Sequence, residues 1–272
     1  VVQAGGKGTR LEHLTRNKPK ALVPINNLPM LFYLFKKYPE KNFIIIGDYK
    51  KDVLEKYLSA FAKVKYLVVG TEGNNGTCSG ISQAMKIIPE KEAFMLIWSD
   101  LILPNSFQLP EETNNWIGIS KGFTCRWKYK SNRFEEEKSD EYGVAGLFVF
   151  SDKSELEHVP QSGEFVRWLQ EEKKVFEELP LFKTKEYGLI KDISEPQSGR
   201  CRPFNKLTVK DNVIIKEGID EQGKSLAVRE KRWYKFCQEA GFDMIPKIYE
   251  FEPFTMERID GKNVFEYKLS AD

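Results

Sequence analysis

Short apolar runs alternate with helix-like segments through the first hundred residues. Runs such as Val1–Ala4 and Phe43–Ile46 have the length of buried strands, whereas Asp52–Phe61 places its apolar side chains on one face of a helix. The pattern predicts strands at 1–4, 43–46, 64–69 and 94–98, and helices at 31–38, 52–61 and 80–88. Strands that alternate with helices predict a mostly parallel α/β sheet covered on both faces.

The pattern changes twice further along the chain. Strands are expected at 116–120, 122–129 and 143–150, helices at 163–172 and 186–193, and a solvated turn at the charged stretch 134–141. The turn-type cluster Pro196–Gly199 predicts a boundary between domains at 1–199 and 200–272. The second part is expected to run strand, strand, helix, strand, strand, at 206–209, 212–217, 225–240, 248–251 and 254–258.

Composition excludes several classes of protein. The 272 residues are 41% hydrophobic with a formal net charge of +2, which supports a large core and gives no electrostatic case for a nucleic-acid or membrane-surface partner. Four cysteines without a CxxC pair, and two histidines, argue against a thiolate or imidazole metal site and against a disulfide framework. We therefore expect a cytoplasmic protein without a membrane span. Because the chain starts without Met inside an apolar run, we also expect that a few strand residues have been trimmed from its start.

A glycine-rich segment follows the first expected strand. Gly5, Gly6 and Gly8 allow backbone N–H groups to approach an anion, and Arg10 and Lys20 add a guanidinium and an ammonium suited to phosphate oxygens. Glycines alone are also compatible with an ordinary turn between a strand and a helix. A dinucleotide fingerprint would need a third glycine where Leu11 stands, and the Walker P-loop pattern is absent.

The combined pattern G-G-x-G-T-R-L at 5–11 and K-P-K-A-x-x-P at 18–24 resembles the nucleotidyltransferases that make sugar nucleotides, a family that includes NDP-sugar pyrophosphorylases and phosphocholine cytidylyltransferases. The resemblance runs from residue 1 to about 205 and implies a Rossmann-like fold of the GT-A type, an NTP substrate and a Mg²⁺ ion. It implies that Arg10 contacts the β- and γ-phosphates and that Lys20 contacts the reacting phosphates. The nucleotide-binding residues that it implies are Gln3, Ala4, Gly5, Gly6, Gly8, Thr9, Gly76 and Thr77.

The loop at 73–81 keeps Gly76-Thr77 but otherwise departs from the family's pattern. Its small residues permit close backbone approach, although an ordinary strand-to-helix turn is the alternative. The departure leaves the base of the nucleotide open among CTP, UTP, dTTP and GTP.

Two acidic positions are candidate metal ligands. Asp100 ends an apolar strand, and the carboxyl end of a parallel strand is where such sheets bind ligands. The resemblance makes Asp100 a Mg²⁺ ligand, although a helix-capping aspartate would look the same. Glu186 stands near the family's second metal carboxylate, with Asp192 as the alternative.

The acceptor is expected to be a phosphorylated small molecule. The resemblance assigns Glu137 and the catalytic Lys138 to its phosphate, with Glu164 as a further contact. A sugar 1-phosphate is favoured, giving a precursor for surface polysaccharide. A phospho-alcohol such as phosphocholine is the alternative, with Trp98, Trp116, Trp127 and Tyr129 as possible cage residues. A non-catalytic sugar-nucleotide-binding scaffold is the rival class, and an oligomer is possible.

The last 65 or so residues resemble the N-lobe of kinases of the choline kinase and aminoglycoside phosphotransferase type. Lys216 ends a strand, Glu230 lies on the following helix, and Met256-Glu257 stands where such kinases contact adenine. The resemblance implies an ion pair between Lys216 and Glu230 over ATP phosphates, within a small α+β segment. Because only twelve residues follow Asp260, we expect the native protein to be longer and its kinase part to be truncated here.

Overall fold

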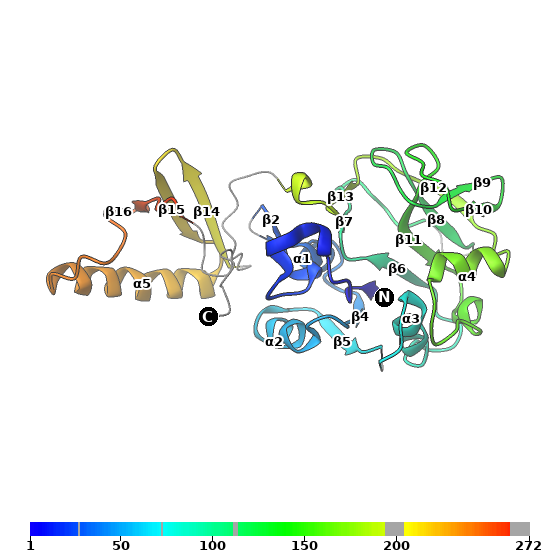
Figure 1. Ribbon diagram of the computed structural model, residues 1–272. Coiled ribbons are helices and arrows are strands. Elements are labelled where there is room, and N and C mark those ends of the chain that lie inside the picture. The colour runs from blue at the N-terminus through cyan, green and yellow to red at the C-terminus, as the bar shows by residue number, and fades with distance from the viewer. Residues whose placement is uncertain (27, 72, 111–113, 194–203, 262–272) are drawn as a thin grey trace, which may run out of the picture. The chain divides into compact units, whose positions relative to one another are not determined.

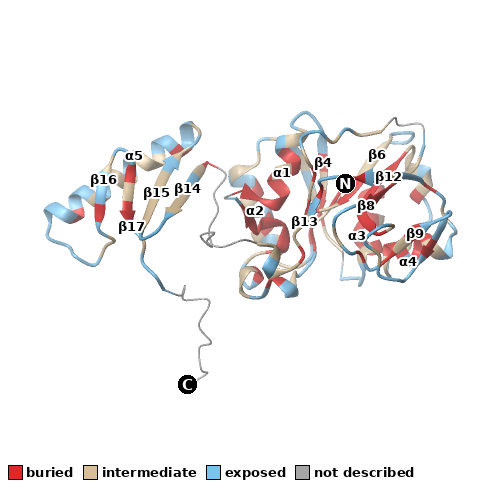
Figure 2. Cartoon of the chain, turned by 90° about the horizontal axis from the view of Figure 1, so that it is seen from above, coloured by how far each residue is buried: buried red, intermediate tan, exposed pale blue. Residues whose placement is uncertain are grey.

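The chain forms two compact units. The computed structural model describes residues 1–26, 28–71, 73–110, 114–193 and 204–261. The first unit consists of Val1–Leu22 and Met30–Asp192, and the second of Val23–Pro29 and Ile193–Asp272. Each unit has its own sheet and its own core of buried side chains (Figures 1 and 2).

A seven-stranded sheet with the order β12-β8-β11-β6-β1-β4-β5 organises the first unit. The strands are β1 (Val2–Gln3), β4 (Asn42–Ile46), β5 (Lys65–Val69), β6 (Phe94–Trp98), β8 (Trp116–Ser120), β11 (Val144–Phe150) and β12 (Glu177–Leu181). β6, β1, β4 and β5 run parallel, and β12 runs parallel to β8. β11 is antiparallel to both of its neighbours. The expectation of a mostly parallel α/β sheet is confirmed.

Helices cover both faces of this sheet (Figure 1). They are α1 (Met30–Lys37), α2 (Lys51–Phe61), α3 (Thr77–Met85) and α4 (Phe165–Glu171). Successive strand residues point to opposite faces, so Phe43 and Ile46 of β4 lie on different sides. The Phe43 ring meets Phe35 of α1 with centroids 4.8 Å apart. Ile46 meets Gly80 of α3, where an added Cβ would come within 2.0 Å of its side chain.

Short elements connect and flank the main layers. They are the 3-10 turns η1 (Thr9–Thr15), η2 (Lys20–Leu22), η3 (Lys153–Leu156) and η4 (Ile190–Asp192), and the strand pairs β7 (Leu101–Ile102) with β13 (Lys185–Glu186) and β9 (Lys128–Lys130) with β10 (Arg133–Glu135). The β9–β10 hairpin places Phe134 in an aromatic core, where its ring lies 6.0 Å from that of Phe176. Part of the charged stretch 134–141 is therefore strand rather than turn.

Two sequence expectations for this unit are wrong. The predicted strand at 122–129 is reduced to β9, because the Ser120 hydroxyl accepts the N–H of Phe123 at 3.0 Å and bends the chain away from β8. The predicted helix at 186–193 is replaced by β13 and η4. Glu186 pairs with Leu101 in a strand ladder, and the Tyr187 N–H donates to the Asp100 carbonyl at 3.0 Å.

The second unit is a four-stranded antiparallel sheet with one long helix. The sheet has the order β14-β15-β17-β16, with β14 (Asn205–Lys210), β15 (Val213–Gly218), β16 (Ile248–Phe251) and β17 (Phe254–Glu257). Helix α5 (Glu221–Glu239) joins β15 to β16, so the predicted element order is confirmed. The helix begins four residues before the expected Ser225 because the Asp220 carboxylate accepts the Gly223 N–H at 2.8 Å and caps it. The hairpin of β2 (Pro24–Ile25) and β3 (Leu28–Pro29) also belongs to this unit.

Among the described residues, no helix combines the length and the apolar character that crossing a membrane requires. The boundary cluster Pro196–Gly199 lies outside the described residues.

Gly80 provides a test of how tightly α3 packs against the sheet. Alanine normally stabilises a helix by about 1 kcal/mol relative to glycine. Gly80→Ala is expected instead to destabilise the protein by about 1–3 kcal/mol, because the added methyl would overlap Ile46. Urea denaturation measures the change. Gly122→Ala is the control, because no atom lies within 4 Å of its added Cβ, and it should leave stability unchanged or slightly higher. Equal stability of the two variants would contradict the close packing of α3.

Candidate active site

The glycine-rich loop begins where β1 ends, at the carboxyl edge of the parallel strands. The Ala4 N–H donates to the Ile46 carbonyl at 2.9 Å, which carries the chain one residue beyond β1 before the loop departs. Gly5 lies so close to Asp48 that an added Cβ would be 2.8 Å from the Asp48 Cβ. Gly8 adopts a left-handed conformation with φ of 61°, as glycine can do without strain. No atom lies within 4 Å of a Cβ added at Gly6, so this part of the loop is open.

Lys20 and Asp100 form an ion pair beneath this loop. The Lys20 ammonium donates to the Asp100 carboxylate, and both side chains are largely buried, at 11% and 13% exposure. Lys20 lies in η2, and its Cβ would be 3.0 Å from a Cβ added at Gly8, so the lysine packs directly against the loop. Asp100 follows β6, the strand that pairs with β1. The parallel pairing thus brings the loop, the ammonium and the carboxylate to one edge of the sheet.

Glu186 and Arg10 complete a cluster of four charges. A Cβ added at Gly188 would be 2.5 Å from Glu186 Oε1 and 3.7 Å from Arg10 Nη2, so Gly188 separates the two side chains only narrowly. Burial and the nearby Asp100 carboxylate raise the pKa of Glu186, while Lys20 and Arg10 act to lower it. The structure therefore brings together four of the residues expected from the sequence.

Asp192, the alternative metal ligand, has a structural task. Its carboxylate accepts the Leu189 N–H at 2.8 Å and closes the turn that contains η4. Its charge still contributes to the raised pKa of Glu186, but less than that of Asp100. Glu186 is therefore the better partner for Asp100.

The acidic side chains of the cluster are candidate ligands for Mg²⁺. Within the described ranges, no group of three or more His, Cys, Asp or Glu side chains is arranged to hold a metal ion. Mg²⁺ is nevertheless commonly bound by one or two carboxylates, with waters and substrate phosphates as the remaining ligands. The pair of Asp100 and Glu186, which repel each other in the absence of a cation, fits that kind of site.

Gln3 presents a buried acceptor beside the loop. Its Oε1 atom is buried and has no hydrogen-bond partner among the residues that the structure describes. Gln3 pairs with Ile46 on one side and with Trp98 on the other, so the three side chains share the face that α3 covers. Trp98 in turn lies over Gly146, where an added Cβ would be 1.8 Å from the indole. An unpartnered amide oxygen at this position can accept an N–H group of a ligand.

Gly76 and Thr77 are tied to the start of α4. A Cβ added at Gly76 would be 2.2 Å from the Gly163 carbonyl oxygen, and the Cys78 N–H donates to the same oxygen at 3.0 Å. The Thr77 hydroxyl accepts the Phe165 N–H at 2.8 Å. The glycine is needed for this close approach, and the threonine side chain is engaged in positioning α4.

The three residues expected to contact an acceptor lie apart from the four-charge cluster. Glu164 accepts the Trp127 Nε1–H at 2.8 Å and a guanidinium N–H of Arg126 at 3.2 Å. Glu137 is paired with Lys128 at 2.8 Å, and Lys138 is exposed. In the part of the chain that the structure describes, no hydrogen bond or ion pair joins Glu137, Glu164 or Lys138 to that cluster.

Sequence reasoning missed several residues of the loop's support. Thr15 and Tyr49 hold the loop by hydrogen bonds, and Arg126 joins Glu164 to the β9–β10 hairpin. Thr15 lies four positions after the buried Leu11 at the end of the loop, and this closeness in sequence is the signal that could have identified it. Tyr49 and Arg126 gave no local signal, because their contacts join residues more than thirty positions apart.

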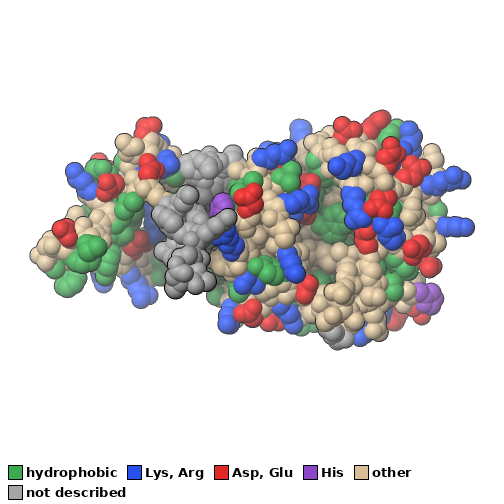
Figure 3. Space-filling model, viewed as in Figure 1, with side chains coloured by type: hydrophobic (Ala, Val, Ile, Leu, Met, Phe, Trp, Pro, Cys, Tyr) green, Lys and Arg blue, Asp and Glu red, His purple; other side chains and the backbone are tan. Residues whose placement is uncertain are grey.

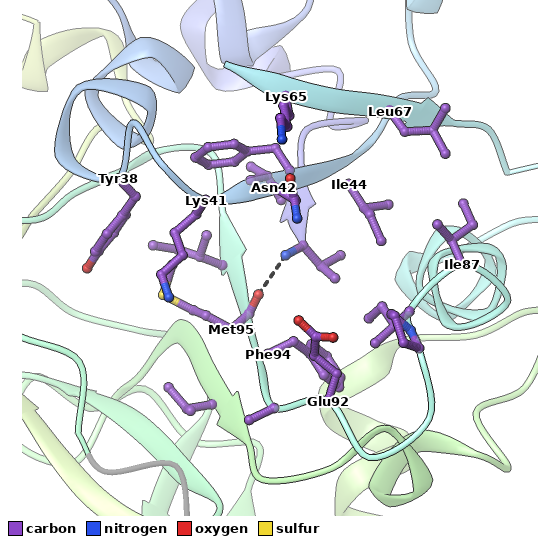
Figure 4. A pocket seen from close by; sticks show the side chains of 18 of the residues that line it. Tyr38, Lys41, Asn42, Ile44, Lys65, Leu67, Ile87, Glu92, Phe94 and Met95 are labelled. Atoms are coloured by element: carbon purple, nitrogen blue, oxygen red, sulfur yellow. Dashed lines mark hydrogen bonds between the residues drawn. The ribbon is translucent and has the colours of Figure 1, made fainter.

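Hollows occur at more than one place in the first unit. Figure 3 shows a hollow with hydrophobic side chains at its floor and Lys and Arg side chains on its rim. A separate cavity of about 910 Å³ lies at the amino ends of β4 and β6 and is lined by Tyr38, Lys41, Asn42, Phe94 and Met95, among others (Figure 4). There the Val1 nitrogen donates to the Met95 carbonyl at 2.7 Å. That cavity lies at the opposite end of the strands from the charged cluster.

Comparison with known proteins agrees with this arrangement. Residues 1–116 match the family described as Nucleotidyl transferase. The chain is 41% identical over 265 residues to a glucose-1-phosphate cytidylyltransferase of Salmonella typhimurium, which covers 83% of this chain and 96% of that protein. It is 28% identical over 124 residues to the bifunctional protein GlmU of Methanococcus maripaludis. That match covers 44% of this chain and only 29% of the GlmU protein, so the chain spans about a third of the length of such relatives.

The fold is also shared with solved structures. The inositol-1-phosphate CTP transferase of T. maritima superimposes with a TM-score of 0.56 at 19% identity, covering 71% of this chain and 90% of that one. The range that matches the family model, residues 1–116, contains the glycine-rich loop, Lys20 and Asp100, and the match to the Salmonella protein extends over most of the chain. The chain belongs to the nucleotidyl transferase family.

Proposed function

We propose that this chain transfers a nucleoside monophosphate from an NTP to the phosphate of a small acceptor, with release of pyrophosphate. The observation that carries the proposal is the convergence of Arg10, Lys20, Asp100 and Glu186 beneath the glycine-rich loop. The loop supplies backbone N–H groups for the triphosphate, and the two cations neutralise charge on it. The product would be an activated precursor for surface polysaccharide.

The chemistry needs no general base. A phosphate oxygen of the acceptor attacks the α-phosphorus in line, a new P–O bond forms, and the bond to the β-phosphate oxygen breaks as pyrophosphate leaves. The attacking oxygen is already an anion, so the residues must position the reactants and neutralise the charge that they share. Mg²⁺ held by Asp100 and Glu186 would add charge neutralisation when bound. Arg10 would hold the leaving phosphates, and Lys20 would act at the reacting phosphates.

The nucleotide's base would lie against Gln3. Its unpartnered Oε1 calls for an N–H donor, and the neighbouring Trp98 offers an apolar surface on the same face of the sheet. The Salmonella relative is a cytidylyltransferase, which makes CTP the first nucleotide to test, with UTP, dTTP and GTP beside it.

A sugar 1-phosphate is the favoured acceptor. The Salmonella relative acts on glucose 1-phosphate. The alternative, phosphocholine, would require an aromatic cage for its quaternary ammonium. Of the four aromatic residues considered for a cage, Trp127 and Tyr129 are buried in the core, and the Tyr129 hydroxyl donates to the Phe176 carbonyl at 3.1 Å. Glu137, Lys138 and Glu164 are the candidate residues for the acceptor, at a place apart from the charged cluster.

The second unit supports a second proposal, that it binds ATP as a kinase-like N-lobe. Lys216 of β15 and Glu230 of α5 form an ion pair with both side chains mostly buried, at 19% and 29% exposure. The pair joins the middle of an antiparallel sheet to the helix that follows it, which is the arrangement that a phosphate-holding lysine needs. Met256 of β17 is buried beside β15, and Glu257 is exposed at the strand's end.

The transferase proposal predicts a specific loss on removing either cation. Arg10→Ala and Lys20→Ala should each lower kcat for pyrophosphate release by roughly 10²–10³, the range for removal of one charge-stabilising donor. Release is measured with Mg²⁺ across CTP, UTP, dTTP and GTP, each with glucose 1-phosphate and with phosphocholine. Lys56→Ala, which removes an exposed cation on α2, should leave the rate unchanged. If the wild-type chain releases no pyrophosphate with any pair of NTP and acceptor, the transferase proposal is refuted and a binding scaffold is favoured.

The ATP-binding proposal predicts that Lys216→Met weakens binding of a fluorescent ATP analogue by at least tenfold. The chain used carries Arg10→Ala, so that the first unit contributes little to the signal. Lys206→Met is the matched control, because Lys206 lies on the neighbouring strand and pairs with Glu217 at the surface. Equal affinity of the Lys216→Met and Lys206→Met chains would refute ATP binding by this unit.

A further inference from the structure

The glycine-rich loop contains one residue in a strained backbone conformation. Glu12 has φ of 49° and ψ of −119°, a region that residues with a Cβ rarely occupy. It interrupts η1 two residues after Arg10. Such a conformation persists only where the surrounding structure holds it in place, and it is found most often at binding sites and clamps.

The Thr15 hydroxyl holds this conformation. Its Oγ1 donates to the Gly8 carbonyl at 3.0 Å and lies 3.3 Å from the Glu12 carbonyl, and the side chain is 4% exposed. The Gly8 carbonyl also accepts the Leu11 N–H at 2.8 Å, and Leu11 is fully buried. The backbone at Gly8, Leu11 and Glu12 is therefore held in place, and Arg10 is an exposed residue between these fixed points.

Tyr49 braces the same turn from outside. Its hydroxyl donates to the Thr15 carbonyl at 3.0 Å, and its backbone N–H donates to the Gly5 carbonyl at 3.3 Å. One residue thus links the start of the glycine-rich loop to the end of η1. Among the described residues, the hydrogen bonds of the Thr15 hydroxyl go to the Gly8 and Glu12 carbonyls and not to a charged group of the cluster.

We propose that Thr15 is a positioning residue that aims the Arg10 guanidinium at the phosphates of the nucleotide. The inference rests on the transferase proposal and adds the means by which its loop is held. Without the Thr15 hydroxyl, the Glu12 carbonyl loses this contact and the Gly8 carbonyl loses one of its two bonds, keeping the one from the Leu11 N–H. The turn would then relax, and the guanidinium would leave its place beside Gly188 and Glu186.

Thr15→Val and Thr15→Ser test the proposal, since valine keeps the shape and serine keeps the hydroxyl. Thr15→Val should lower kcat/KM for the NTP by roughly tenfold or more, the effect of losing one buried hydrogen bond. Thr15→Ser should restore most of the activity. In a chain that already carries Arg10→Ala, Thr15→Val should have little further effect, because there is no guanidinium left to aim.

Binding of inorganic tripolyphosphate supplies a readout that does not need turnover. Thr15→Val should weaken the thermal shift that tripolyphosphate produces, as Arg10→Ala does. Ser151→Ala is the control, because it loses a partly buried hydroxyl bond, to Asn115, that does not involve the loop and should leave tripolyphosphate binding unchanged. If Thr15→Val does not fold, Tyr49→Phe and Thr15→Ser are measured in its place, with a loss expected for Tyr49→Phe and near wild-type values for Thr15→Ser.

The outcomes separate this proposal from the one on which it rests. A wild-type chain that releases no pyrophosphate defeats the transferase proposal, while tripolyphosphate binding still tests Thr15. The role of Thr15 would be overturned if Thr15→Val kept the wild-type kcat/KM and the wild-type tripolyphosphate binding while Arg10→Ala lost both. The proposal would also be overturned if the losses of kcat/KM in Thr15→Val and Arg10→Ala were fully additive in the double variant. Full additivity would show that the Thr15 hydroxyl acts independently of the Arg10 guanidinium.

Discussion

The ion pair between Lys20 and Asp100 joins positions 80 residues apart in the sequence, and the rest of the site depends on it. Two charges removed from water are stable only when they remain together, so the pair fixes η2 against the end of β6. Since β1 lies beside β6, the same constraint sets where the glycine-rich loop can run. Glu186 lies close to the Asp100 carboxylate and to the cations of Lys20 and Arg10. Positive and negative side chains therefore offset one another in the site. A triphosphate bound together with a cation would change the net charge that these side chains experience.

Much of the first unit follows from its sequence. The parallel strands could be predicted because each is a short apolar run between helices of clear period, and Asp100 because it ends one of those runs. The grouping of Arg10 with Lys20 followed from a long family motif rather than from periodicity. The predictions that failed lie where side chains compete with the backbone. Ser120 turns the chain by bonding Phe123, and Glu186 lies in a strand because β7 offers it a partner. Neither effect is visible in a local pattern.

The region of the residues predicted to contact an acceptor was the least predictable part of the first unit, for a physical reason. Glu137, Lys138 and Glu164 lie in a charged region where several glutamates are equally able to pair with Arg126, Lys128 or Arg167. The structure selects Glu136 as the carboxylate bound to both arginines, and Glu164 as the partner of the Trp127 indole. Such choices depend on distances of a few ångströms between separate loops, which composition cannot rank. In the second unit, by contrast, Lys216 is the single lysine of β15, and it pairs with Glu230, the one of the three α5 glutamates that lies away from the helix ends.

The contact between Gly76 and Gly163 limits how this protein can diversify. Any side chain at Gly76 would force the two segments apart, whereas Gly73, three positions earlier, has no atom within 4 Å of an added Cβ, although its φ of 78° also favours glycine. Substitutions in the loop are therefore tolerated better near Gly73 than at Gly76, which packs against Gly163. Substitutions can accumulate around the rim of the loop while the joint between α3 and α4 stays intact.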